Sequence, residues 1–171
     1  MEPAELKTRA AAVAQPIERA NGLAYRPTGA TLGALVWALG DEKVELVAAS
    51  LERDAPAGES VSGTIVILTA SLVVRAELER AWVPFGPRHP DGPTGVSVAR
   101  RSSLRSVRLE LPDSASGSGG SLFDVLAVPW GASLVLNYED LSSDIVLNCN
   151  NLRGDTAEEL IQRVVADLRP R

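Results

Sequence analysis

The chain has 171 residues, of which 45% are hydrophobic and 23% are charged. This length and balance fit one globular domain with short extensions, and they exclude collagen-like, disordered and disulfide-scaffold proteins. The 17 basic and 22 acidic residues give a formal net charge of -5. This acidic balance argues against a surface that binds nucleic acid or anionic lipid over its whole extent, and we expect no nucleic-acid partner.

The cysteine content and the start of the chain indicate the compartment. One cysteine, Cys149, is too few for an internal disulfide, and the first residues lack the pattern of a secretory signal. The most apolar run, Ala30 to Leu39, is about half as long as a membrane-spanning helix of roughly 20 residues. These features predict a cytoplasmic protein.

Two helices are predicted before residue 40. Between Glu2 and Ala20 apolar residues recur every three or four positions, and Pro16 is expected to end or kink this helix because proline lacks a backbone donor. The second helix is expected to begin at a Thr28 or Thr31 cap and to end at Gly40. The apolar stripes are Leu6, Ala10, Val13 and Ile17 in the first helix, and Leu32, Leu35, Val36 and Leu39 in the second.

After residue 40 the apolar period changes to that of strands. A first strand is predicted over 44–48, before a charged loop at 52–60. The run Gly63 to Thr69 is apolar on both faces, whereas Leu72 to Leu78 alternates as in a strand with one buried face, and the two predict a hairpin. Further strands are predicted at Val96 to Val98, Arg105 to Leu111, Phe123 to Val128, Ser133 to Tyr138 and Ser143 to Cys149.

Two connectors and a last helix complete the pattern. Trp82 to Gly95 holds four prolines and three glycines, which predicts a long loop, and 112–121 is a flexible polar tract. Asp155 and Glu158 have the spacing of a helix cap and its reciprocal partner. The helix that follows is expected to lie on an apolar surface, with a stripe of Ala157, Leu160, Ile161, Val164, Val165 and Leu168.

This order of elements resembles the pleckstrin-homology (PH) superfold. Asp41 to Val44 leads into the first strand, GTIVILTASLVV (Gly63 to Val74) is similar to a hairpin of the bacterial PH-like and GRAM-like groups, and SSLRSVRLE (Ser102 to Glu110) is similar to their Ser-Ser-Ile-x-x-Val strand. The resemblance implies a mainly β, α+β fold: a seven-stranded antiparallel, partly open barrel capped by a C-terminal helix.

The resemblance covers Gly40 to Arg169 and divides the chain into a PH-like barrel domain at 40–171 and a helical extension at 1–39. The extension lies outside the family pattern. It could decorate the barrel, act as a dimerisation arm or form part of a partner's binding site.

Phosphoinositide binding, a common role of PH domains, does not carry over to this sequence. The family places basic residues in the loop after the first strand. Here that loop, Glu52 to Ser60, has one arginine against Glu52, Asp54 and Glu59, so a phosphate would meet a net negative field.

The residues that could carry chemistry are predicted to have structural roles, with no catalytic residue, cofactor or metal. His89 lies near Asp91 in the long loop, without a nucleophile or second ligand placed beside it. The run from Asn137 to Asp144 is interpreted as a solvated hairpin tip rather than a cation site. Cys149 is predicted to be a buried core residue. Trp37, Trp82 and Trp130 are interpreted as side chains that anchor the core or the loops.

Four arginines, Arg100, Arg101, Arg105 and Arg108, stand out because no acidic residue lies among them. On a regular strand Arg100 and Arg108 share one face and Arg101 and Arg105 the other, unless a bend intervenes. They would either bind phosphate or carboxylate groups, or pair with Glu77, Glu79 or the acidic hairpin tips.

The hypothesis that the sequence favours is a non-enzymatic interaction module that binds a protein partner. Contact would come from the N-terminal helices or from the 82–95 loop, whose Trp82 and Phe85 are residue types found in binding sites. Anionic-lipid binding through Arg100 to Arg108 is one alternative, and a small-ligand carrier or enzyme that uses the barrel interior is another. Homo-oligomerisation stays open.

Overall fold

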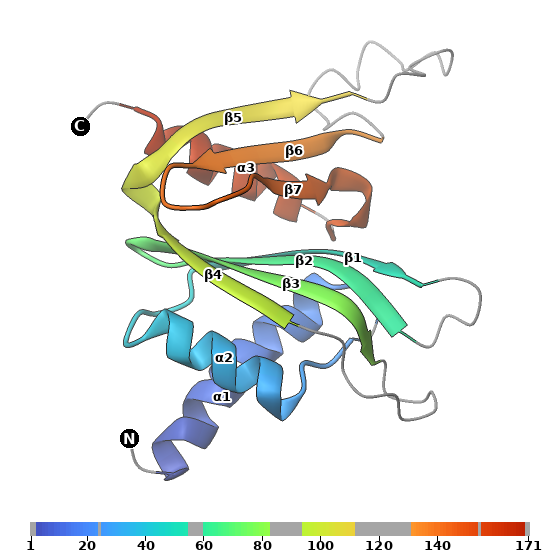
Figure 1. The fold of residues 1–171 in the computed structure, drawn as a ribbon, viewed down its shortest axis with the longest axis vertical. Coiled ribbons are helices and arrows are strands. Elements are labelled where there is room, and N and C mark those ends of the chain that lie inside the picture. Colours follow the sequence, from blue (N-terminus) through green and yellow to red (C-terminus); the bar gives the residue numbers. More distant parts are fainter. Residues whose placement is uncertain are drawn as a thin grey trace.

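A computed structural model of the protein describes residues 3–23, 25–54, 60–82, 94–111, 131–153 and 155–169. Figure 1 shows three layers: a pair of helices, a middle sheet, and a second sheet with the last helix beside it. The helices are α1 (Pro3–Ala20), α2 (Gly29–Leu39) and α3 (Thr156–Asp167). The strands are β1 (Leu46–Arg53), β2 (Ser60–Leu68), β3 (Leu72–Trp82), β4 (Thr94–Arg100), β5 (Leu104–Glu110), β6 (Ser133–Tyr138) and β7 (Ile145–Asn148).

These strands form two antiparallel sheets, a four-stranded sheet in the order β1-β2-β3-β4 and a three-stranded sheet in the order β5-β6-β7. The predicted hairpin is confirmed as β2 and β3. The Thr69 hydroxyl accepts a hydrogen bond from the Leu72 amide at 2.9 Å and fixes its turn. The last predicted strand is shorter than expected, because Cys149 starts the 3-10 turn η3 (Cys149–Asn151). The predicted strand at Phe123 to Val128 lies outside the described residues.

A single bent segment carries the chain from one sheet to the other. β4 ends at Arg100, the 3-10 turn η1 (Arg101–Ser103) redirects the backbone, and β5 begins at Leu104 (Figure 1). The Arg101 amide donates to the Ser71 carbonyl at 2.8 Å, and the Ser103 hydroxyl donates to the Arg100 carbonyl at 2.8 Å. These two hydrogen bonds stabilise the bend.

The opposite edges of the two sheets meet at Ser50. Its hydroxyl accepts from the Asn148 amide at 3.0 Å and donates to the Asn148 carbonyl at 3.3 Å. A bulge in β2 places Gly63, the partner of Leu51 in β1, at φ 140°, where a Cβ would clash with the Ser50 carbonyl oxygen. Only glycine fits this approach, so the bulge helps to position the link between β1 and β7.

The four-stranded sheet has a hydrophobic core on each face. The helix-side core joins α1 and α2 to the sheet through Val13, Ile17, Leu35, Val36, Leu39, Ala49, Ile65, Val74 and Ala76. The sheet-side core joins the same sheet to the three-stranded sheet and α3 through Ala48, Val66, Val73, Leu134, Leu136, Tyr138, Ile145, Leu160 and Val164. Consecutive residues, Ala48 and Ala49, therefore belong to different cores.

The two cores correct the strand patterns expected from the sequence. β1 was expected to alternate and β3 to bury one face, but Val47, Ala48 and Ala49 are all buried, and so are Val73 and Arg75. The reason is tertiary, because helices cover one face of these strands while the second sheet covers the other.

The N-terminal helices form largely as predicted. Thr28 caps α2 by accepting from the Thr31 amide, and Gly40 ends it at φ 54°, as expected. α1 continues through Pro16 to Ala20, so Pro16 does not end it. Residues 3–39 are thus a helical layer that shares a core with β1, β2 and β3.

The C-terminal helix packs on an apolar surface as predicted. Ala157, Leu160 and Val164 enter the sheet-side core, where α3 packs against β1 and β5. The buried stripe is narrower than expected, because Val165 and Leu168 are exposed. The predicted cap is wrong, since the Asp155 side chain makes no capping hydrogen bond.

The expected mainly β, α+β class is confirmed. Within the ranges that the structure describes, the two sheets do not close into a barrel. Of the helices described, none is long and apolar enough to cross a membrane.

Candidate partner-binding site

The four arginines singled out in the sequence lie along the bend between the sheets. Arg100 ends β4, Arg101 is in η1, and Arg105 and Arg108 lie on β5. Because η1 interrupts the strand, the alternation of faces does not run through all four. Each guanidinium lies within ion-pair distance of a carboxylate.

Three of these arginines pair with the turn between β6 and β7. Arg100 contacts both carboxylate oxygens of Asp140, through Nε at 3.0 Å and Nη2 at 3.1 Å. Arg105 contacts Glu139 at 2.7 Å, and Arg108 contacts Asp144 at 3.0 Å. Of the two alternatives that the sequence left open, pairing with an acidic hairpin tip is the one observed for these three. The pKa of Asp140 is held well below its ordinary value, chiefly by the Arg100 hydrogen bond.

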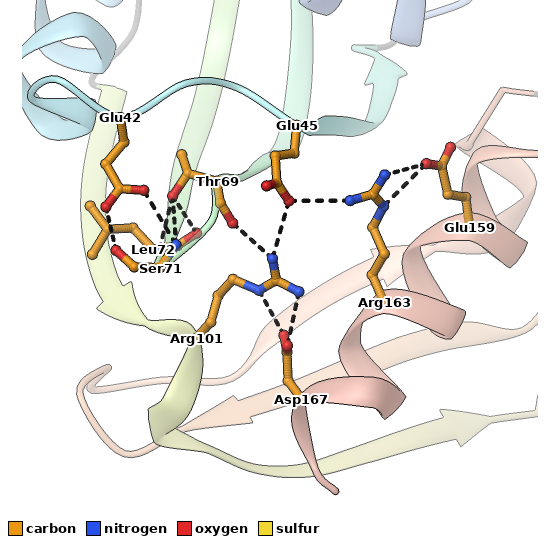
Figure 2. Close-up of polar contacts among 9 residues, drawn as sticks. All are labelled: Glu42, Glu45, Thr69, Ser71, Leu72, Arg101, Glu159, Arg163 and Asp167. Carbon is orange, nitrogen blue, oxygen red and sulfur yellow. Dashed lines mark hydrogen bonds and ion pairs between the residues drawn. The ribbon is translucent and has the colours of Figure 1, made fainter. Parts of the chain in front are cut away.

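Arg101 has a different environment, which Figure 2 shows. Its side chain is 14% exposed and makes two 2.8 Å hydrogen bonds to Asp167 of α3. The same guanidinium donates to the Thr69 carbonyl at 2.8 Å and to Glu45 at 3.3 Å. The Asp167 hydrogen bonds raise the pKa of Arg101. Arg101 therefore joins α3 to both the β2–β3 turn and Glu45, the residue before β1.

A second arginine extends this polar network. Arg163 of α3 contacts Glu45 at 3.2 Å and Glu159 at 2.9 Å (Figure 2). On the far side, Glu42 accepts from the hydroxyl of Ser71, which lowers the Glu42 pKa. These contacts fasten α3 and the bend to the four-stranded sheet, so they support the fold.

Arg75 is a buried cation that the sequence interpretation missed. It is 6% exposed on β3, and its Nη1 donates to the Ser143 carbonyl at 3.2 Å, the Ser143 hydroxyl at 2.9 Å and the Asp144 carbonyl at 3.2 Å. Its Nε donates to Ser97 at 3.1 Å, and Glu77 lies 3.4 Å away. Arg75 thus ties β3 to the β6–β7 turn. The apolar pair just before it, Val73 and Val74, was the available sign that both faces are covered.

The aromatic residues singled out in the sequence lie in different parts of the chain. Trp82 is the last residue of β3, but its side chain and the whole of Phe85 lie outside the described residues. Trp37, expected as a core or loop anchor, is 85% exposed on α2. The four-residue stripe predicted for α2 leaves position 37 on another face, and this could have revealed it.

A groove of about 470 Å³ lies beside α2. Its apolar wall includes the buried Val13, Val36 and Leu39. The charged residues lining it are Glu5, Arg9, Asp41, Glu42 and Lys43. Arg9 pairs with the exposed Asp41 at 2.9 Å and so joins α1 to the segment after α2. The apolar wall and the exposed Trp37 belong to one helical layer.

Cys149 and the run from Asn137 to Asp144 contribute to the packing and hydrogen bonding of the fold. Cys149 is buried in the sheet-side core as predicted, and burial raises the pKa of its thiol. The run from Asn137 to Asp144 spans the end of β6 and the β6–β7 turn, where Asn137 donates to Asp144 at 2.6 Å. In the part of the chain that the structure describes, no three His, Cys, Asp or Glu side chains are grouped to hold a metal. His89 lies outside that part.

No protein-family model, no curated protein and no solved structure matches the chain.

Proposed function

We propose that the protein is a non-enzymatic module of the PH-like superfold that binds a protein partner through the exposed face of its α1–α2 layer. The order of elements supports the superfold, since a four-stranded antiparallel sheet precedes a three-stranded sheet and a helix that packs against β1 and β5. The α1–α2 layer is the N-terminal extension that lies outside the family pattern.

The exposure of Trp37 is the observation that carries this proposal. Tryptophan is a residue type enriched at the centres of protein interfaces, where its large ring buries apolar area at a small cost in side-chain entropy. Here the ring is 85% exposed on a helix that is itself fixed by buried Leu35, Val36 and Leu39. A helix that is held by its buried face and presents an uncovered indole suits partner binding.

The environments of the reactive groups support a non-enzymatic role. The arginine cluster is ion-paired and the Cys149 thiol is buried with a raised pKa. In the described part of the chain these groups serve the packing of the sheets. Their contacts give no support to a role in a reaction.

The same ion pairs weigh against the anionic-lipid alternative. A phosphate at this cluster would have to displace Asp140, Glu139, Asp144 or Asp167 from its arginine. The interior-pocket alternative is also disfavoured, since fully buried Tyr138, Leu136 and Ile145 fill the space between the sheets. Contact through Trp82 and Phe85 stays a prediction.

Affinity capture from the native host tests the proposal. Removal of the whole extension is unsuitable, because it would expose the helix-side core. Instead, tagged wild type is compared with Trp37→Ser and with the control Val146→Ser, which removes another exposed apolar side chain, 51% exposed on β7. We expect the proteins captured by wild type, including further copies of the chain itself, to be retained by Val146→Ser and lost with Trp37→Ser.

Retention of the same proteins by Trp37→Ser would contradict the proposal. Sedimentation with anionic vesicles at low salt, lost on replacing Arg100 and Arg108 with glutamine, would favour the lipid alternative instead.

A further inference from the structure

The solvent face of α2 is apolar throughout. Helical spacing places Ala30, Gly33 and Trp37 on one side, and all three are exposed. The sequence of α2, GATLGALVWAL, has no charged residue. Exposed helix faces normally carry charged side chains, so an uncharged face with a protruding indole indicates a surface that is covered in the working state of the protein.

The groove next to α2 has the properties of a receptor for such an indole. Its volume of about 470 Å³ and its wall of Val13, Val36 and Leu39 offer apolar contact. Glu5 and Asp41, whose Oδ1 pairs with Arg9, also line it, and a buried indole needs an acceptor for its N–H, which a carboxylate can supply. α2 itself supplies Val36 and Leu39 to the groove, with Trp37 between them in sequence, so anchor and groove lie close together on one layer.

The charge distribution argues for the nature of the partner. Residues 1–41 contain four basic and four acidic residues, whereas residues 42–171 contain thirteen basic and eighteen acidic residues and so carry the whole net charge of -5. A strongly charged partner would find no complementary field at the neutral layer. Two copies of this acidic chain, by contrast, can approach through this layer without the repulsion that their other surfaces would produce.

Resting on the proposed function, we propose that the partner of this surface is a second copy of the chain. In the dimer, Trp37 of each copy inserts into the groove between α1 and the 41–44 segment of the other. A two-fold axis makes the contact reciprocal, so each interface contains two identical anchor-and-groove contacts. The small side chains at Ala30 and Gly33 leave room for the two α2 helices to approach closely.

Sedimentation equilibrium of the purified full chain, at concentrations from about 1 to about 200 μM, tests whether the protein dimerises. Wild type and the control Val146→Ser are expected to dimerise. Two variants are expected to be monomeric over the range: Trp37→Ser, which removes the anchor, and Ala12→Arg, which puts a long charged side chain on an exposed groove residue. At low concentration, each monomeric variant should unfold at the same temperature as wild type, which shows that the variant is folded.

Mixing the two monomeric variants tests reciprocity. Trp37→Ser keeps an open groove and Ala12→Arg keeps its indole, so the mixture regains one of the two contacts and should form a heterodimer weaker than the wild-type dimer. Fluorescence gives a further test when the wild type alone is titrated over the same concentrations. The emission of Trp37, obtained by subtracting the spectrum of Trp37→Phe from that of wild type, should shift to shorter wavelength as the wild type dimerises.

Distinct outcomes separate this inference from the proposed function. If the wild type stays monomeric at about 200 μM, the dimer is overturned. The proposed function survives this result if Trp37→Ser still loses a captured protein of another kind. A dimer that both Trp37→Ser and Ala12→Arg retain overturns the anchor and groove. Monomeric variants whose mixture stays monomeric overturn the reciprocal arrangement.

Discussion

The two faces of the four-stranded sheet are covered in different ways. On the sheet side, polar contacts cross between the layers: Ser50 to Asn148, Arg75 to Ser143, and Arg101 to Asp167. On the helix side, α1 and α2 meet the sheet through apolar side chains such as Ile17, Leu35 and Leu39.

The difference indicates how each layer is positioned. Hydrogen bonds and ion pairs are directional, so the orientation of the three-stranded sheet and α3 is specified by particular partners. The helical layer depends on shape and apolar area, which are less directional. We therefore infer that the helical layer tolerates small shifts, whereas the second sheet does not.

A cavity in each core tests whether the two layers are held separately. Leu35 and Leu160 are both fully buried, one in each core. Replacement of either by alanine should lower the free energy of unfolding by about 2–5 kcal/mol, because transfer and cavity terms add. Urea unfolding measures the loss, and hydrogen exchange shows where it acts.

If the layers are held separately, Leu35→Ala should accelerate exchange mainly in α1 and α2, and Leu160→Ala mainly in β5–β7 and α3. Uniform acceleration across the chain in both variants would show one cooperative unit instead, and would remove the distinction between the faces.

Replacement of Arg75 tests how much the polar contacts between the sheets contribute to stability. In Arg75→Met the Ser143 and Asp144 carbonyls lose their buried donor, which should cost about 2–3 kcal/mol. The matched control is Arg105→Met, whose ion pair with Glu139 is exposed and should contribute about 0–1 kcal/mol. Equal urea midpoints for the two variants would mean that Arg75 does not fasten the sheets.

Much of the secondary structure was predictable because it depends on local periodicity. The β2–β3 hairpin follows from the turn around Thr69 between two apolar runs, and α2 follows from its Thr28 cap, its stripe and Gly40. The apolar pair Val73 and Val74 indicated that both faces of β3 are covered, but the layers that cover them were not predictable, because these layers come from segments remote in sequence. The same holds for Arg101, whose partner Asp167 is 66 residues away.

The candidate site shows the same limit. The cluster from Arg100 to Arg108 was visible in the sequence, but its carboxylate partners lie on a distant turn and on α3, so the sequence left ligand binding and ion pairing open. Trp37 was visible as a residue type. Its exposure depends on which side of α2 meets the sheet, and the stripe of Leu32, Leu35, Val36 and Leu39 was the evidence for that.

The smallest expected effect concerns the exposed part of the polar side. Arg100 lowers the pKa of Asp140 in the folded protein. A lowered pKa means that the contact stabilises the fold fully above the ordinary aspartate pKa of about 4, and that this stabilisation is lost as the pH falls further and Asp140 takes up a proton. Asp140→Asn lacks this titration.

The urea midpoint of wild type should therefore exceed that of Asp140→Asn by a constant amount above about pH 5, and the gap should close below about pH 4. Glu139→Gln is the matched control, since it changes a neighbouring carboxylate on the same turn and leaves the bidentate contact of Arg100 with Asp140 in place. A gap that persists unchanged to pH 2 (about two units below the ordinary value) would mean that the ion pair does not stabilise the turn. The polar contacts that hold this side together would then be those of the buried Arg75 and the partly buried Arg101, which bridge the layers.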